Sequence, residues 1–234
     1  MSRKIGIICA GDREFEPFIK HIENDIVSEQ AMLKIHQGTI NGLDIVALYS
    51  GVCKVNAAIA TQVLIGSFGA EIIINAGTAG GMDERLEIFD VVISTEAAYH
   101  DVFPTILTEF HPWLDTEYFK ADQKLVELSK IVVRKMKTLN NVVWGRIVTG
   151  EKFIAEDGRK EINEKYSPLI VDMETASIAH VCHVNKVPFI SIRCITDTAK
   201  HSGNNNFEKN CGKASEISRD ITLVLLNEIR CNYQ

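Results

Sequence analysis

The stretch IIINAGTAGG, residues Ile72–Gly81, joins a run of three β-branched residues to a segment in which three of seven positions are glycine. A short apolar run of this kind is typical of a strand that is buried on both faces, as in a parallel sheet. We expect the strand to end near Ile74 and residues 75–81 to form a tight turn, where glycine lets a ligand approach the backbone N–H groups closely. The glycine spacing is not G-x-G-x-x-G, so the dinucleotide-binding fingerprint is absent.

Similar apolar runs lie on both sides of this stretch and alternate with helical patterns. Asn41-Gly42 predicts a hairpin turn, because both central residues of the favoured turn need positive φ. The predicted strands are residues 4–9, 33–40, 43–49, 72–74, 91–93, 142–148, 169–173 and 188–195. The predicted helices are residues 54–68, a helix with the apolar stripe Leu125, Leu128, Val132 and Met136, a helix around Ile178, and a long amphipathic helix with Ala214, Ile217, Ile221, Leu225 and Ile229.

This alternation predicts an α/β fold, with a largely parallel sheet between two layers of helices. The chain has 234 residues and shows no internal repeat or Pro/Gly/Ser-rich linker, so we expect one domain over residues 1–234. In such sheets the ligand lies beyond the carboxyl ends of the strands. Polar residues that follow the strands are therefore the candidates for a functional site.

Composition narrows the class of partner. The 25 basic and 31 acidic residues give a net charge of −6, and no basic block stands out. A duplex-binding surface needs clustered Lys and Arg, so we expect a small-molecule substrate and no nucleic-acid partner. We also expect no membrane association, since the apolar runs are too short to span a bilayer and no export signal is found. The six cysteines form no C-x-x-C pair, which indicates reduced thiols and a cytoplasmic protein.

Three acidic residues, Glu14, Glu174 and Asp197, come directly after predicted strands. Three carboxylates at one sheet edge are able to divide acid, base and electrostatic roles among them. The alternative for each is a structural one, because acids at strand-to-helix junctions often cap the helix N-terminus.

Other motifs exclude several chemistries. Gly212-Lys213 and residues 150–153 lack the pattern of a phosphate-binding loop, and no G-x-S-x-G motif supports a serine hydrolase. His180 and His183 share a helix but have no acidic residue nearby to complete a ligand set, so we expect no metal. The polar cluster at residues 99–101 (Tyr-His-Asp) is either functional or a loop network.

Taken together, these segments resemble the purine nucleoside phosphorylase superfamily, and specifically its hydrolytic branch, the 5'-methylthioadenosine/S-adenosylhomocysteine nucleosidases. The resemblance extends over nearly the whole chain, and it implies a single three-layer α/β/α domain with a mixed central sheet of the nucleoside phosphorylase type. The matching segments are residues 4–8, 50–58, 75–81, 99–101, 171–176, 178–182 and 193–197.

The resemblance implies an N-glycosyl hydrolase that needs no cofactor and releases adenine from a 5'-substituted adenosine. Asp197 would be the general acid towards adenine N7, and Glu14 would position and activate the attacking water. Glu174 would hold the ribose hydroxyls. The remaining substrate-binding residues implied are Met173 behind the sugar, Arg193 orienting the carboxylate, Phe153 and Ile154 at adenine, Val52 and Phe207 at the 5' substituent, and Thr78, Gly80, Asp172 and Thr196.

The chain departs from the family pattern at three places. Gly11–Glu14 stands where relatives have a Met-Glu-Glu-Glu-like run, so a methionine is missing while the essential Glu remains. Asp172 replaces a Glu. Residues 102–112 differ from the family loop that crosses to the partner subunit and lines the 5' alkylthio pocket. The apolar stretch 103–107 would otherwise face water, and a homodimer is therefore expected.

Several alternatives stay open at the level of sequence. The protein could be a phosphate-dependent nucleoside phosphorylase of the same superfamily or a non-catalytic nucleoside-binding module. Anionic Glu14, however, stands where phosphate would have to bind. Phe207 could be a lid or a core anchor of the last helix. The sequence does not choose among methylthioadenosine, S-adenosylhomocysteine, 5'-deoxyadenosine and aminodeoxyfutalosine as the preferred substrate.

Overall fold

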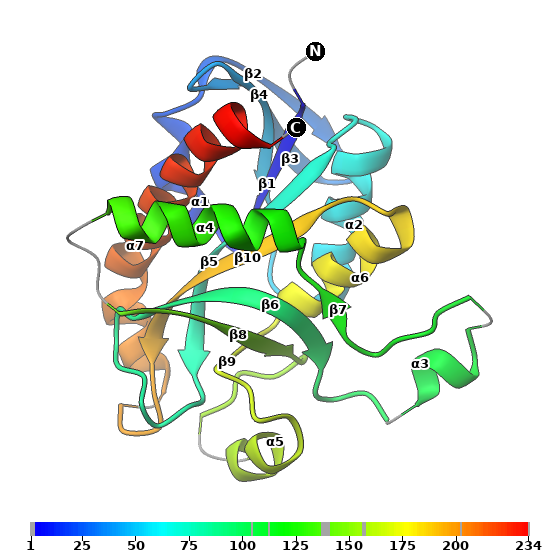
Figure 1. Cartoon of the computed structure of the whole chain (residues 1–234), viewed down its shortest axis with the longest axis vertical. Helices are drawn as coiled ribbons and strands as arrows, with labels where there is room; N and C mark the ends of the chain where they lie inside the picture. The colour runs from blue at the N-terminus through cyan, green and yellow to red at the C-terminus, as the bar shows by residue number, and fades with distance from the viewer. Residues whose placement is uncertain are drawn as a thin grey trace.

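A computed structural model describes residues 3–103, 105–111, 113–136, 141–155, 158–201 and 203–233. Over these ranges the chain forms one ten-stranded sheet with helices on both faces (Figure 1). The strands are β1 Ile5–Cys9, β2 Glu23–Gln30, β3 Leu33–Ile40, β4 Leu43–Tyr49, β5 Ile72–Gly81, β6 Val91–Tyr99, β7 Phe119–Lys120, β8 Val142–Thr149, β9 Ile170–Asp172 and β10 Phe189–Asp197. The helices are α1 Asp12–Ile19, α2 Lys54–Gly66, α3 Ile106–Glu109, α4 Gln123–Lys135, α5 Arg159–Tyr166, α6 Thr175–Asn185 and α7 Asn204–Asn232.

The sheet is mixed, as the nucleoside phosphorylase type requires. Strand β1 lies parallel to β4 and β5, and β5 lies parallel to β10, whereas β2, β3 and β4 are antiparallel neighbours. Strand β10 also pairs with β6, and β9 joins β8 to β5, so β10, β6, β8, β9 and β5 close into a ring. The expectation of a largely parallel sheet holds for the ladders that join β4, β1, β5 and β10 and those that join β6, β8 and β9, but not for the pairings β2–β3, β3–β4, β5–β9, β6–β7 and β6–β10, which are antiparallel. Because alternation along the chain is a local pattern, it does not reveal antiparallel pairing between distant strands.

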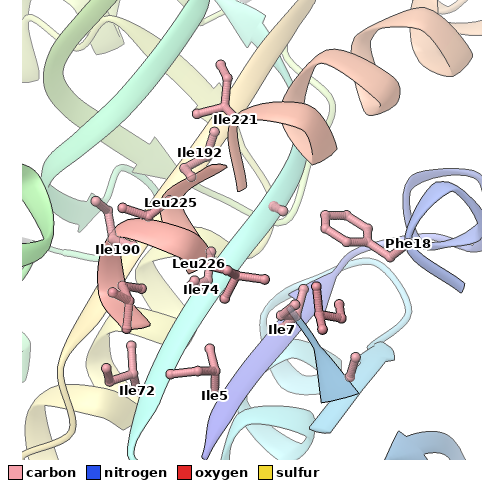
Figure 2. Packing of buried hydrophobic residues seen from close by; sticks show 14 of the residues in the cluster. Ile5, Ile7, Phe18, Ile72, Ile74, Ile190, Ile192, Ile221, Leu225 and Leu226 are labelled. Atoms are coloured by element: carbon pink, nitrogen blue, oxygen red, sulfur yellow. The ribbon is translucent and has the colours of Figure 1, made fainter. Parts of the chain in front are cut away.

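The core has two main parts, one on each face of the sheet. Side chains at alternate positions of β1, β5 and β10 pack against α1, α4 and α7, as the isoleucines and leucines of Figure 2 show. The intervening positions pack against α2 and α6. The molecule therefore has the predicted three layers. Successive side chains of β1, β5 and β10 point to opposite faces of the sheet, so each of these strands contributes side chains to both parts of the core.

The segment after Ile74 does not form the predicted turn. Strand β5 continues to Gly81, and all of its positions but Gly80 are buried. Its glycines permit close approach, because a Cβ atom on Gly77 would lie 2.6 Å from Glu14 Oε1 and 2.8 Å from Arg193 Nη1. Strand β10 supplies ladder partners as far as Gly80, and β9 pairs with Gly80 and Gly81; this pairing overrides the preference of glycine for turns.

Other elements differ in extent from the prediction. Helix α7 begins at Asn204 and not near Ala214, and β6 runs on to Tyr99. Strand β2 was missed because its residues are almost all exposed and show no apolar alternation; it forms the edge of the sheet. No helix in the described part of the chain is long and apolar enough to cross a membrane.

Candidate active site

An open cleft of about 460 Å³ lies where β1, β5, β9 and β10 end and α1 and α7 begin. It gathers residues from nearly the whole length of the chain. The sequence-predicted residues that line it are Glu14, Val52, Thr78, Gly80, Phe153, Asp172, Met173, Glu174, Thr196, Asp197 and Phe207. Ile154 lines a small adjoining pocket together with Phe153 and Asp197, and Arg193 is buried within contact of the cleft carboxylates. The fold thus brings all thirteen candidates to one place.

Glu14 is held in place from two directions. Its Oε2 accepts hydrogen bonds from the backbone N–H groups of Ala10 (2.8 Å) and Gly11 (3.2 Å), which makes it part of the N-terminal cap of α1. Its Oε1 accepts from the N–H (2.6 Å) and the hydroxyl (2.7 Å) of Thr78. The helix-cap alternative is therefore correct for Glu14, but it does not exclude a functional role, because the capped carboxylate also lines the cleft.

Arg193 ties the acidic side chains together. It is completely buried on β10, and its guanidinium lies 3.2 Å from Asp172, 3.3 Å from Glu174 and 3.7 Å from Glu14. Burial works to lower the pKa of Arg193, but these three carboxylates outweigh burial and raise it. A buried cation among three acids fixes their positions, in agreement with the orienting role that the resemblance implied.

Glu174 has a different environment from Glu14. Its Oε1 accepts a 3.0 Å hydrogen bond from the backbone N–H of Cys53, and its Oε2 lies 3.3 Å from Arg193 Nη2. Burial raises the pKa of Glu174 to about 7, although the Arg193 charge opposes this. Cys53 was not singled out from the sequence. Its φ of 85° is unusual for a residue with a side chain, and it precedes α2 with its N–H directed at Glu174.

Asp172 mainly supports the start of α6. Its Oδ1 accepts hydrogen bonds from the backbone N–H of Thr175 (3.1 Å) and from the hydroxyl of Thr149 (2.6 Å). Its Oδ2 accepts from the hydroxyl of Thr175. The cap expected of Glu174 is thus made by Asp172, which leaves Glu174 free for the cleft.

Asp197 ends β10 and is 1 % exposed. The hydroxyl of Thr196 donates to its Oδ1 at 2.9 Å, whereas Oδ2 has no hydrogen-bond partner among the described residues. Burial raises the pKa of Asp197, and the Thr196 hydrogen bond and the Arg159 charge only partly counteract it. A carboxyl group in this setting tends to keep its proton and to donate it to a bound ligand.

Strand β5 sets the distance between the two ends of the cleft. Glu14 is bonded to Thr78, and Asp197 Oδ2 lies beside Gly80, 3.2 Å from the Cβ position of that residue. Thr78 and Gly80 are two residues apart on the strand, which is roughly 7 Å along its axis. The two carboxyl groups therefore meet β5 on the same face at neighbouring positions.

Phe207 lies in the first turn of α7 and lines the cleft, with its ring centroid 6.5 Å from that of Phe153. It is only half-buried and belongs to none of the buried core clusters, which favours the lid over the core anchor. Next to it, Glu208 pairs with Arg13 at 2.5 Å. Arg13 is thereby engaged with a carboxylate at the mouth of the cleft.

Of the Tyr99-His100-Asp101 cluster, Asp101 takes part in a loop network, whereas the hydroxyl of Tyr99 contacts Ser177 and His180 on α6. Lys54 Nζ donates to Asp101 Oδ1 (2.8 Å), and Asp101 Oδ2 accepts from the backbone N–H of Glu151 (2.9 Å). Glu151 in turn accepts from the N–H of Lys54 (3.0 Å). This network joins the start of α2 to the loop that carries Phe153.

Sequence analysis missed residues that act through backbone contacts. Arg159 binds the carbonyls of Ile154 and Ala155, and Asn210 donates to the carbonyl of Thr196 at 2.8 Å. No motif marks such residues, because any carbonyl in reach serves as the acceptor. In the ranges that the structure describes, no group of His, Cys, Asp and Glu side chains is arranged to hold a metal ion.

The divergent segment 102–112 surrounds α3, which extends away from the body of the molecule (Figure 1). Phe103 is 75 % exposed and Phe110 79 %, whereas Leu107 is half-buried. Pro104 and Pro112 lie outside the described residues. None of the described residues of this segment lines the cleft of this chain.

Comparison with known proteins agrees with this geometry. The model of the phosphorylase superfamily matches residues 4–227. The 5'-methylthioadenosine/S-adenosylhomocysteine nucleosidase of Staphylococcus carnosus is 37 % identical, over 96 % of this chain and all of the relative, and that of Actinobacillus succinogenes is 36 % identical, over 97 % and 99 %. A crystal structure of the nucleosidase from Colwellia psychrerythraea in complex with adenine is 32 % identical, covers 97 % of this chain and 96 % of the other, and superimposes with a TM-score of 0.89. The chain therefore belongs to the phosphorylase superfamily and, within it, to the 5'-methylthioadenosine/S-adenosylhomocysteine nucleosidase family.

Proposed function

We propose that this protein hydrolyses the N-glycosidic bond of 5'-methylthioadenosine and S-adenosylhomocysteine, releasing adenine and the 5-substituted ribose. The observation that carries the proposal is the pairing of a buried acid with a buried carboxylate across one cleft. Asp197 Oδ2 lacks a hydrogen-bond partner among the described residues, and Glu14 is held as an acceptor by Thr78, two residues before Gly80, which lies beside Asp197. Relatives over nearly the full chain are named for this activity.

The departure of adenine is the more demanding step of the reaction. Adenine departs readily only when a ring nitrogen is protonated as the bond stretches, and Asp197 is the donor for N7. Phe153 and Ile154 share the small pocket with Asp197 and would contact the purine there. The C1'–N9 bond then breaks and its electron pair goes to the purine.

The sugar centre develops positive charge as the bond breaks, and anionic side chains stabilise it. Glu174 would bind the ribose hydroxyls, with Met173 against the sugar and Arg193 holding the carboxylate in place. Glu14 would orient a water molecule, whose oxygen forms the new C1'–O bond while Glu14 accepts one of its protons. Thr78, Gly80 and Thr196 line the cleft between these groups.

Release of adenine in phosphate-free buffer tests the reaction type. A hydrolase releases adenine from 5'-methylthioadenosine at the same rate with and without phosphate, whereas a phosphorylase depends strictly on phosphate. Hydrolysis is favoured because Arg13, the cation at the mouth of the cleft, is paired with Glu208. Binding of nucleosides without any adenine release would instead indicate a non-catalytic module.

The same assay, run with each of the four nucleosides separately, ranks by kcat/KM the substrates that the sequence left open. Val52 and Phe207 line the cleft and would contact the 5' group, so an apolar methylthio group suits the site of a single chain. We expect methylthioadenosine and S-adenosylhomocysteine to be preferred over 5'-deoxyadenosine and aminodeoxyfutalosine.

We further propose a homodimer in the cytoplasm. The exposed apolar side chains around α3 support the dimer, because such side chains are normally covered by a partner. The six cysteines all carry free thiols and four of them are buried, which fits a reducing compartment.

A further inference from the structure

Arg159 is a buried cation whose guanidinium reaches the end of β5, the strand that pairs with the end of β10 at Asp197. It is the first residue of α5, follows Gly158 at φ 82°, and is 8 % exposed. Its Nε donates to the carbonyl of Ala155 at 2.9 Å, its Nη2 to that of Ile154 at 3.4 Å, and its Nη1 to that of Gly81. One guanidinium group therefore ties the loop beside Phe153 to the end of β5.

The contact with Gly81 brings Arg159 close to Asp197. In the register of β5 and β10, Gly80 lies opposite Asp197, and a Cβ atom on Gly81 would lie 3.4 Å from the backbone oxygen of Asp197. The charge of Asp197 works against burial in setting the pKa of Arg159, and the charge of Arg159 works against burial in setting the pKa of Asp197.

We propose that Arg159 is a positioning residue for proton transfer. It fixes the loop that carries Phe153 and Ile154, and it stabilises the Asp197 carboxylate that remains after the proton has moved to the purine. The inference rests on the proposed function. In that reaction the proton leaves Asp197 for N7, the C1'–N9 bond breaks, and the oxygen of water bonds to C1' while Glu14 takes up one proton of that water. A new anion then sits in a buried site, where a fixed nearby cation lowers its energy.

The other charges around Asp197 are already engaged or lie at the surface. Glu14, Asp172 and Glu174 surround Arg193, Arg13 pairs with Glu208, and Lys152 is exposed. The charged residues in the described part of the chain that share the cleft or its side pocket with Asp197 are Asp12, Arg13, Glu14, Lys152, Asp172, Glu174 and Glu208. Arg159 is therefore the buried cation best placed to act on the acid.

The pH profile of adenine release separates the two roles of Arg159. Activity needs protonated Asp197, so the rate falls as pH rises through the pKa of this acid, and an opposing cation holds that pKa down. In Arg159→Met the alkaline limb should move up by about one pH unit, and kcat should fall about tenfold because the acid is weaker. In Arg159→Lys the charge remains, so the alkaline limb should stay at the wild-type pH. KM should nevertheless rise several-fold, because an ammonium group lacks the planar set of donors with which the guanidinium binds three carbonyl groups.

Arg219→Met is the matched control, because Arg219 on α7 is also 8 % exposed but pairs with Asp220 and does not line the cleft. Folding is followed by circular dichroism and thermal melting, and Arg159→Gln replaces Arg159→Met if the latter does not fold. In an Asp197→Asn background, removal of the Arg159 charge should cost no further kcat.

Two results would overturn the inference: a folded Arg159→Met whose alkaline limb stays at the wild-type pH, or a full additional loss of kcat in the Asp197→Asn background. Either outcome leaves the proposed function intact as long as the wild type releases adenine. A wild type that releases none refutes the proposed function instead.

Discussion

At the scale of single residues, Glu14 combines a structural and a chemical role. Its four hydrogen bonds cap α1 and attach it to Thr78 on β5, and the same carboxylate faces the cleft. In Glu14→Gln one of the two carboxylate oxygens becomes an N–H donor that meets the N–H groups of the backbone. We expect turnover to fall at least 100-fold and the free energy of unfolding to drop by about 1–3 kcal/mol.

Adenine release and urea unfolding measure the two effects separately. Glu16→Gln is the control, since Glu16 lies on the same helix with its side chain exposed, and it should change neither quantity. Binding of an adenine-containing product analogue should survive in Glu14→Gln. Near-normal turnover in a folded Glu14→Gln would remove Glu14 from the mechanism.

At the scale of elements, the first turn of α7 determines how the cleft is covered. Phe207 meets Phe153 there, and the Arg13–Glu208 pair attaches this turn to α1. In Phe207→Ala the lost apolar cover should raise KM for methylthioadenosine roughly tenfold or more, with little change in thermal stability, because the ring is only half-buried.

Steady-state kinetics with a melting curve measures the effect of Phe207→Ala. Lys209→Ala is the control, because Lys209 is exposed on the same helix and does not line the cleft. An unchanged KM together with a large loss of thermal stability would show that Phe207 is a core anchor of α7.

At the scale of the whole molecule, apolar side chains are concentrated around α3. Phe103, Phe110 and Trp113 are each at least 75 % exposed. If this region is the dimer interface, Trp113→Glu should convert a two-chain species into a monomer in sedimentation velocity. Ile26→Glu on the edge strand β2, where the side chain is also exposed, should leave the dimer intact. A monomeric wild type would contradict the dimer.

Much of the candidate site could be predicted from the sequence. The acids Glu14, Glu174 and Asp197 were found because each follows a strand, and strand ends meet at one sheet edge. Which acid caps a helix was not predictable, because capping depends on where the side chain turns: Asp172 caps α6, and Glu174 does not. Arg159 escaped notice because its partners are backbone carbonyls, which carry no sequence signal.

The sequence alone determined the order of eight strands and of the helices α2, α4, α6 and α7, the three layers, and the acidic residues after the strands, because apolar periodicity and chain order are local properties. It did not indicate β2, β7, α1, α3 or α5, which are short or largely exposed. Only the tertiary structure decided that β5 runs through its glycines to Gly81 and that β5, β6, β8, β9 and β10 close into a ring. It also decided that Asp197 is buried with one unpartnered oxygen next to the charge of Arg159. The physical reason is that strand pairing, burial and the field of a distant cation depend on residues far apart in the chain.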